Sequence, residues 1–267
     1  STTRDVSKLI SKLKEDNIDG LIIDLRNNGG GSLAEVNNLV GLFIPQGPTV
    51  QVHYSFGHTQ VLADQDPSVL YDGPLVVLTN RLSASASEIF AGAIQDYGRG
   101  LIVGSQTFGK GTVQTLIPLF RGQMKVTNAK FYRVSGDSTQ HRGVTLDIHY
   151  PEIYDIEKIG ESALEEALPW DKIDASKYKP QHSLSSVIPS LEKAHMKRIK
   201  DNPDFEYLNE QVEFLKELRN DTSISLNIDT REKERLDTEA RRLALENKRR
   251  KAKGLKLLAK LADDADE

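Results

Sequence analysis

The sequence predicts an α/β domain with a largely parallel sheet, followed by a mainly α-helical C-terminal domain. Two observations predict the first part. Short apolar segments rich in β-branched residues alternate with segments of helical periodicity, and Gly-rich or Ser-rich turns join them. A third observation predicts the second part, because near Pro151 the aliphatic segments give way to long stretches rich in Lys, Glu, Arg and Leu. We place the boundary between residues 150 and 180.

The individual elements follow from their periodicity. Apolar spacing predicts helices at residues 5–16, 33–44 and 85–98. Short apolar runs predict buried strands at 20–25, 74–80 and 101–105, and alternation predicts a hairpin at 49–63 around Gly57 and strands at 112–119 and 122–134. Beyond the boundary, helical patterns cover 184–219 and 229–262, the second with a stripe of leucines, namely Leu236, Leu243, Leu245, Leu255, Leu257, Leu258 and Leu261.

Composition excludes several classes of function. The 267 residues carry a net charge of −4, which gives no general attraction to nucleic acid or anionic membranes. No cysteine is present, so disulfides, thiolate metal sites and a cysteine nucleophile are excluded. No apolar run reaches the length of a membrane span. The chain begins at Ser1, without Met, directly in a helical pattern, so we expect it to be a portion of a longer protein.

The stretch NRLSASASEIFA at residues 80–91 is a candidate catalytic turn. Ser83, Ser85 and Ser87 follow a predicted strand and precede a helix, whose N-terminal N–H groups can stabilise an oxyanion. The structural alternative is that a serine only caps the helix, with Glu88 completing a capping box from Ser85. Local sequence alone favours this alternative.

A serine nucleophile needs a base, and the sequence offers two kinds. Six histidines are present, but none lies in a convincing catalytic turn, so a Ser-His-Asp triad stays open without a supporting motif. Lys110 in TFGKGTVQ comes shortly after a predicted strand and lies between two glycines. If residues 110–114 are extended, the side chains of Lys110 and Gln114 lie on the same side of the chain. A lysine base must be neutral, which requires a desolvated site. The alternative is a solvated loop lysine. The six histidines are His53, His58, His141, His149, His182 and His195.

The glycines of NNGGG at residues 27–31 form a turn whose N–H groups can face a ligand. A merely tight strand-to-helix turn is one alternative. A phosphate cradle is the other, but neither common nucleotide-binding glycine motif is present.

Four segments in order, DGLIIDLRNNGGG, NRLSASASEIFAGAIQDYGRG, VGSQTFGKGTVQ and FYRVSGDSTQHRGVTLDI, resemble the tail-specific or C-terminal processing proteases, which are Ser-Lys endopeptidases of the S41 type. The resemblance implies a crotonase-like protease core with βαβ units at residues 1–150, N-terminally incomplete. A connector packed on the core at 151–180 and a helical C-terminal domain at 181–267 follow, since GESALEEALPWDKI and the helical remainder resemble the C-terminal region of the larger members.

The resemblance also implies roles for single residues. Ser85 is the expected nucleophile, Lys110 the general base and Gln114 the residue that orients it. The expected oxyanion donors are the backbone N–H groups of Ala86 and of Gly31, with Gly30 as the alternative to Gly31. No metal or cofactor is implied.

Substrates and surroundings are implied by the resemblance alone. We expect unfolded or flexible protein substrates with apolar C-termini, and a tail-recognising PDZ domain upstream of Ser1. The expected location is the periplasm, with a peripheral position at the inner membrane as one alternative. The helical region is a candidate surface for an adaptor protein or for self-association. The basic cluster at 247–253 is interpreted as a solvated face rather than a nucleic-acid site, since no aromatics are interleaved.

Two alternatives to a protease stay open. In the first, the chain is a catalytically incomplete fragment that acts as a binding scaffold through its helical arms. A crotonase-like hydrolase of small acyl compounds is the third hypothesis, but it has no reason to keep the spacing of Ser85, Lys110 and Gln114.

Overall fold

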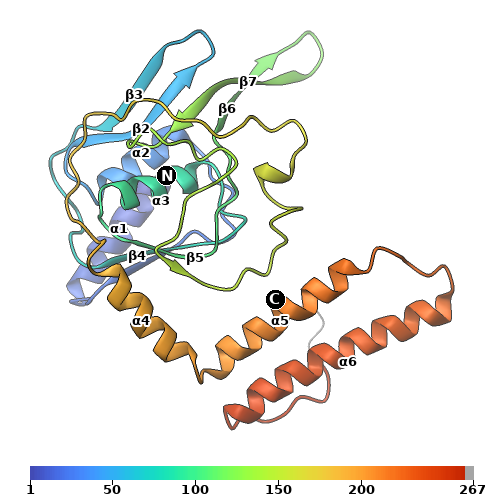
Figure 1. Cartoon of the computed structure of the whole chain (residues 1–267). Coiled ribbons are helices and arrows are strands. Elements are labelled where there is room, and N and C mark those ends of the chain that lie inside the picture. Colours follow the sequence, from blue (N-terminus) through green and yellow to red (C-terminus); the bar gives the residue numbers. More distant parts are fainter. Residues whose placement is uncertain (262–267) are drawn as a thin grey trace. The chain divides into compact units, whose positions relative to one another are not determined.

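The computed structural model describes residues 1–261, and their contacts divide into two compact units. The first unit is Ser1–Pro189 and the second begins at Ser190; the chain is coloured from blue to red along its sequence in Figure 1. By its contacts, the segment 151–189 belongs to the first unit. The three-part division at residues 150 and 180 stays a prediction. Within residues 1–261, no helix combines the length and the apolar character needed to cross a membrane.

A four-stranded parallel sheet forms one layer of the first unit, in the order β1-β4-β5-β8. Its strands are β1 (Leu21–Asp24), β4 (Leu75–Thr79), β5 (Leu101–Gly104) and β8 (Ile148–His149). All three neighbouring pairs are parallel. The prediction of an α/β core with a parallel sheet is therefore confirmed.

The prediction that the first of these strands is buried was wrong. Ile22 in β1 is 65% exposed, whereas Val77 in β4 is fully buried. The reason is the position of β1 at the edge of the sheet, where its side chains alternate between half-buried and exposed. An apolar run of four residues does not distinguish an edge strand from a central one.

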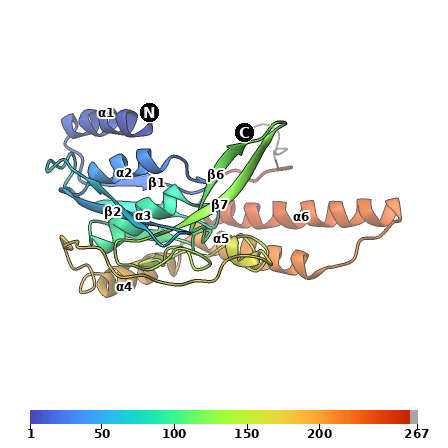
Figure 2. The same cartoon turned by 90° about the horizontal axis from the view of Figure 1, so that it is seen from above.

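An antiparallel sheet forms the second layer, in the order β3-β2-β7-β6. Its strands are β2 (Gly47–Tyr54), β3 (Thr59–Asp64), β6 (Thr112–Pro118) and β7 (Gln123–Tyr132). The predicted hairpin turns at Gly57, whose φ of 88° suits a glycine. The β6–β7 hairpin projects from the body of the unit in both views (Figures 1 and 2). β6 is an edge strand, and it begins two residues after Lys110.

One helix, α3, packs against both sheets. α3 contacts β5 of the parallel sheet and β2 of the antiparallel sheet, and α2 contacts α1, α3, β2 and β3. Phe43 and Phe90 meet edge to face in the core, with ring centroids 5.7 Å apart. The helices of the first unit are α1 (Thr2–Glu15), α2 (Leu33–Gly41), α3 (Ala86–Asp96) and the short 3₁₀ helix η1 (Glu161–Ala163).

The rest of the described chain is helical, as α4 (Ile188–Ile199), α5 (Pro203–Asn220) and α6 (Ile228–Ala252). The predicted helix at 229–262 was too long, because α6 ends at Ala252 and Gly254 follows with a φ of 68°. Leu255 and Leu257 lie beyond the helix, so the leucine stripe is not one helix face. Residue 262 lies outside the described residues.

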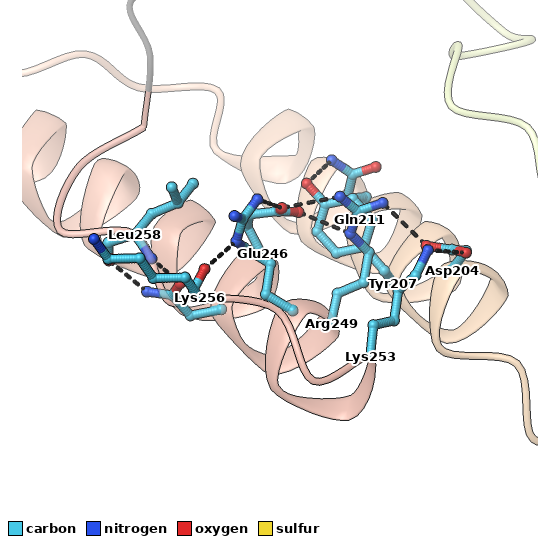
Figure 3. Close-up of polar contacts among 10 residues, drawn as sticks. Asp204, Tyr207, Gln211, Glu246, Arg249, Lys253, Lys256 and Leu258 are labelled. Carbon is cyan, nitrogen blue, oxygen red and sulfur yellow. Dashed lines mark hydrogen bonds and ion pairs between the residues drawn. The ribbon is translucent and has the colours of Figure 1, made fainter.

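Ion pairs join α5 and α6 (Figure 3). Asp204 binds both Arg249, at 3.0 Å, and Lys253, at 2.7 Å. Lys248 pairs with Glu206 at 2.7 Å. Three basic residues of the cluster at 247–253, namely Lys248, Arg249 and Lys253, therefore form ion pairs with acidic residues of α5.

Candidate active site

The two turns that the sequence singles out lie side by side at the carboxyl ends of β1 and β4. Because these strands are neighbours in a parallel sheet, their following turns meet at one edge. The N–H of Ala84 donates to the Asn28 carbonyl at 3.0 Å. The hydroxyl of Ser83 donates to the Leu25 carbonyl at 2.7 Å, and that of Ser87 to the Asn28 carbonyl at 2.9 Å. Ser83 and Ser87 thus hold the two turns together.

Ser85 occupies the junction between the turn and α3. It is the N-cap residue, with φ 57° and ψ −115°, a backbone conformation that residues other than glycine rarely adopt. Such strain persists only where surrounding contacts enforce it, and it is typical of nucleophiles on strand-to-helix turns. Of the three serines, Ser85 is the one that lines a pocket shared with Lys110.

The glycine turn contacts Ser85 closely at Gly30. A Cβ atom at Gly30 would lie 2.5 Å from the Ala84 carbonyl oxygen and 2.7 Å from the Ala86 nitrogen, and its φ is 94°. Its N–H donates to the Asn28 side chain at 2.9 Å. The Gly31 N–H has no acceptor among the described residues, and Gly31 lines the pocket beside Ala86. These contacts favour Gly31 over Gly30 as an oxyanion donor.

Ala86 supplies the second candidate donor. It is the first residue of α3, where backbone N–H groups have no acceptor within the helix. The positive end of the helix dipole adds to the stabilisation of negative charge at this point.

Glu88 connects the nucleophile turn to the lysine turn. Its fully buried carboxylate accepts the N–H of Ser85 at 2.8 Å and the N–H of Lys110 at 2.9 Å. It also accepts the N–H of Gly109 at 2.7 Å and the hydroxyl of Thr107 at 2.6 Å. Burial raises the pKa of Glu88 to about 7, although these four donors act in the opposite direction.

Lys110 and Gln114 reach the same pocket as Ser85. This pocket has a volume of about 310 Å³, and all five residues expected from the sequence line it, namely Gly31, Ser85, Ala86, Lys110 and Gln114. The Gln114 amide donates to Thr127 at 3.4 Å, and the hydrogen bonds of the described residues include none between Gln114 and Lys110. The expected orienting contact of Gln114 therefore stays a prediction.

None of the six histidines is among the lining residues of this pocket, all of which lie in the described part of the chain. His195 is buried against Phe205 in the helical region, with ring centroids 5.7 Å apart. The basic side chains that line this pocket are therefore those of Lys110 and Lys125. Within residues 1–261, no cluster of three or more His, Cys, Asp or Glu side chains is suited to a metal ion.

Sequence reasoning missed the wider role of Glu88. The capping pattern indicated its bond to Ser85, but the other three donors come from residues 107–110, which no local pattern links to α3. It also missed Gln140, which accepts the Gly111 N–H at 2.9 Å and donates to Glu161 at 3.0 Å. No sequence signal indicated this contact.

Comparisons with known proteins indicate the family to which the chain is similar. The profile of peptidase family S41 matches residues 1–150, and the profile described as the C-terminal domain of tail specific protease matches residues 154–267. The tail-specific protease of Haemophilus influenzae is 43% identical over 98% of this chain and 39% of its own length. The carboxy-terminal-processing protease of Bartonella bacilliformis is 41% identical over 54% of this chain and 33% of its own length.

Among solved structures, the photosystem II D1 C-terminal processing protease matches with a TM-score of 0.53 and 36% identity. The match covers 58% of this chain and 41% of that one. This chain therefore spans only 33–39% of the curated relatives named above.

Proposed function

The chain belongs to peptidase family S41, and on that premise we propose that it is a serine-type endopeptidase in which Ser85 and Lys110 form a catalytic dyad. The observation that carries the proposal is the pocket that Ser85, Lys110, Gln114, Gly31 and Ala86 share. The strained backbone of Ser85 supports it further, since such strain accompanies exposed nucleophiles.

The first step is acylation. The amine of Lys110 takes the proton of the Ser85 hydroxyl as the serine oxygen attacks a peptide carbonyl carbon. The carbonyl oxygen becomes an oxyanion and accepts the N–H groups of Ala86 and Gly31, each such donor contributing about 2.7–4 kcal/mol to the barrier reduction. The carbon–nitrogen bond then breaks, and Lys110 returns its proton to the leaving amine.

The second step is hydrolysis of the acyl-enzyme. Water gives a proton to Lys110 as its oxygen attacks the ester carbonyl, and the same two N–H groups stabilise the second oxyanion. Collapse breaks the bond to the Ser85 oxygen, which regains its proton from Lys110. The products are two shorter peptides and the unchanged dyad.

The proposed substrates are unfolded or flexible proteins recognised by apolar C-terminal tails, in keeping with the names of the relatives. The proposed location is the periplasm, with a peripheral position at the inner membrane as one alternative, because the relatives from Haemophilus influenzae and Bartonella bacilliformis are bacterial tail-specific and carboxy-terminal-processing proteases. Contact with an adaptor protein, or self-association, through the helical unit is part of the same proposal.

The test is cleavage of an unfolded protein with an apolar C-terminal tail, followed by mass spectrometry. The chain and its Ser83→Ala variant should cleave, whereas Ser85→Ala and Lys110→Ala should not. Ser83 is the matched control because it lies in the same turn but bonds only to backbone and Asn80. Cleavage by Ser85→Ala would overturn the dyad. Cleavage by no form would favour the scaffold alternative, and hydrolysis of a thioester without proteolysis would favour a small-acyl hydrolase.

A further inference from the structure

The β6–β7 hairpin combines exposed apolar side chains with charge of one sign. It projects from the body of the first unit (Figures 1 and 2). Residues 111–131 contain no Asp or Glu, although the whole chain carries a net charge of −4. Five large apolar side chains of the hairpin are between 41% and 99% exposed, and they are Leu116, Ile117, Leu119, Phe120 and Met124. Apolar side chains gathered on a surface in this way mark an interaction site.

Two cations of the hairpin are available to a partner. Lys130 is used within the fold, where it pairs with Asp171 at 2.5 Å. Arg121 and Lys125 are exposed, and the ion pairs of residues 1–261 include neither of them. No Asp or Glu is among the described residues that line the pocket at the base of the hairpin. The free charge of this region is therefore positive, which favours a partner that carries carboxylates.

The strand register aligns one face of the hairpin with the pocket beside Ser85. Leu116 lies opposite Lys125 across the two strands. Opposite residues of an antiparallel pair share a face, as do residues two apart along one strand, so Gln114, Leu116 and Lys125 lie on the same face. Gln114 and Lys125 both line the pocket. The face that carries Leu116 therefore continues the surface of the pocket outward.

The tip of the hairpin lies beyond this face. The Leu119 N–H donates to the Gly122 carbonyl at 3.1 Å and closes the turn. The turn carries Phe120, which is 99% exposed, next to Arg121. Phe120 follows Gln114 by six residues, so the tip lies about 20 Å farther out along the extended strand.

The charge and the position of this surface distinguish between partners. A second copy of the chain, in a symmetric contact, would bring its own Arg121 and Lys125 against the same two charges, which is unfavourable. A polypeptide held at Ser85 extends out of the pocket along the hairpin. An acidic and apolar part of that polypeptide would meet opposite charge and exposed apolar surface.

We propose that Leu116, Phe120, Arg121 and Lys125, here called the hairpin patch, bind a segment of the substrate polypeptide that carries acidic and apolar side chains about six residues from the cleaved bond. The inference rests on the proposed function and adds a contact with the substrate outside the catalytic pocket. Such a contact raises the local concentration of the bond to be cleaved at Ser85.

Binding to the hairpin patch can be measured without turnover. The full chain carrying Ser85→Ala is titrated with two fluorescent peptides that share an apolar centre and differ in one segment about six residues away. The segment is Glu-Leu-Glu-Phe in one peptide and Lys-Leu-Lys-Phe in the other, and each peptide is made with the segment before or after the centre. In at least one placement, the Glu peptide should bind about tenfold more tightly than the Lys peptide, and salt should reduce the difference. Equal affinities in both placements would overturn the inference.

Charge reversal tests the two cations. Arg121→Glu together with Lys125→Glu should invert the order of affinity of the two peptides, because the patch then favours the Lys peptide. Lys8→Glu together with Lys12→Glu changes the net charge equally at exposed positions of α1 and should leave the order unchanged. An unchanged order in the hairpin variant, or the same inversion in the α1 variant, would refute a role of these cations.

The apolar part of the patch has its own test. Phe120→Ser should weaken binding of the Glu peptide by about tenfold, through loss of an aromatic side chain that the peptide covers. Leu226→Ser is the control, since Leu226 is 102% exposed but lies in the second unit. Self-association that depends on Phe120 in light scattering, or Phe120-dependent binding to phosphatidylglycerol vesicles in place of the peptide, would overturn the inference.

Cleavage separates this inference from the proposed function. With Ser85 present, Phe120→Ser should lower kcat/KM for the Glu peptide by about tenfold relative to a short peptide that ends before the segment, mainly through KM. Ser85-dependent cleavage with the same ratio in wild type and Phe120→Ser would refute the inference alone. Binding of the Glu peptide at the hairpin patch of a chain that cleaves nothing would refute the proposed function alone.

Discussion

Glu88 is a buried carboxylate whose hydrogen-bond partners are all identified. Its carboxylate is fully buried and is surrounded by three backbone N–H groups and one hydroxyl. Two of those N–H groups belong to Ser85 and Lys110, so one side chain sets the backbone positions of both proposed dyad residues. A carboxylate suits this position because its two oxygens accept four hydrogen bonds.

The pH dependence of stability should report on Glu88. Its pKa rises from 4.5 in the unfolded chain to about 7 in the fold, so the folded state holds the proton more tightly. Between these two values the unfolding free energy must therefore fall as pH increases, by about 3 kcal/mol at 1.36 kcal/mol per pKa unit. Denaturant titrations of wild type and Glu88→Gln should give a difference that declines by this amount from about pH 4.5 to 7. Parallel pH profiles of the unfolding free energy in the two proteins would contradict the raised pKa of Glu88.

Gly30 is a second residue with a strict requirement. Its φ of 94° and its contacts with the Ala84 carbonyl and the Ala86 nitrogen leave no space for a Cβ. Gly30→Ala should therefore lower the unfolding free energy by about 2 kcal/mol or more and displace the Ala86 N–H, with loss of cleavage. Gly29→Ala is the control, since a Cβ there meets nothing within 4 Å. Similar losses of stability and of cleavage in Gly30→Ala and Gly29→Ala, measured by denaturation and peptide cleavage, would argue against this steric explanation.

At the scale of elements, the segment after β8 supports the lysine turn. Arg81, which is 1% exposed, donates to the carbonyls of Thr107, at 2.6 Å, and Ile159, at 2.7 Å, and to the hydroxyl of Ser162, at 2.9 Å. The Glu161 N–H donates to the Phe108 carbonyl at 2.9 Å. Residues 156–162 therefore pack behind the turn that carries Lys110.

Arg81→Leu should release this segment. It leaves the buried Thr107 carbonyl without this donor, at about 1–3 kcal/mol for a buried group, and also removes bonds to the half-buried Ile159 carbonyl and the exposed Ser162 hydroxyl. We expect about 1–3 kcal/mol of destabilisation by denaturant titration, with faster amide exchange at Gly111 and Glu161. Arg121→Leu, on the exposed turn of the β6–β7 hairpin, should change neither. An equal effect in both variants would rule out this role.

The sequence predicted elements well where pattern and environment agree. The runs at 74–80 and 101–105 became central strands, because their apolar residues are covered on both sides. Ile22 and the end of α6 were misjudged for different reasons. Edge position depends on tertiary contacts, whereas Gly254 is a local stop signal that the leucine pattern outweighed in our interpretation.

The residues of the candidate site were predictable from the sequence only where they belong to a motif. The residues that line the pocket carry motifs, so the sequence pointed to Ser85 and Lys110. The residues that hold those motifs together are contacts between distant segments, such as Glu88 with residues 107–110 or Gln140 with Glu161. Such contacts have no periodicity and could not be predicted from a single sequence.

At the scale of the whole molecule, the two units draw stability from different sources. Among the described residues, the buried apolar side chains beyond Ser190 are Val212 and Phe214, and all others lie in the first unit. α5 and α6 are joined instead by ion pairs such as Lys248 with Glu206 and Arg241 with Glu217. Exposed pairs of this kind contribute only about 0–1 kcal/mol each and weaken with salt.

Calorimetry in increasing salt should therefore separate the units. We expect the transition of the helical unit to move to lower temperature as sodium chloride increases, and that of the first unit to move little. Lys248→Ala, which removes bonds between α5 and α6, should lower the helical transition by more than Lys216→Ala, whose partner Glu213 lies in the same helix. A salt-independent helical transition, or equal effects of the two variants, would contradict this source of stability.

The hydrogen bonds of Glu88 also allow a reactive thiol to be placed in the pocket without loss of those bonds. They engage the backbone of residues 85 and 110, so the Ser85→Cys variant keeps every one of them. The chain has no cysteine of its own, and that variant therefore carries a single thiol, on a residue that lines one defined cavity. A fluorophore, spin label or disulfide-linked peptide attached there would report on this cavity and on no other part of the chain.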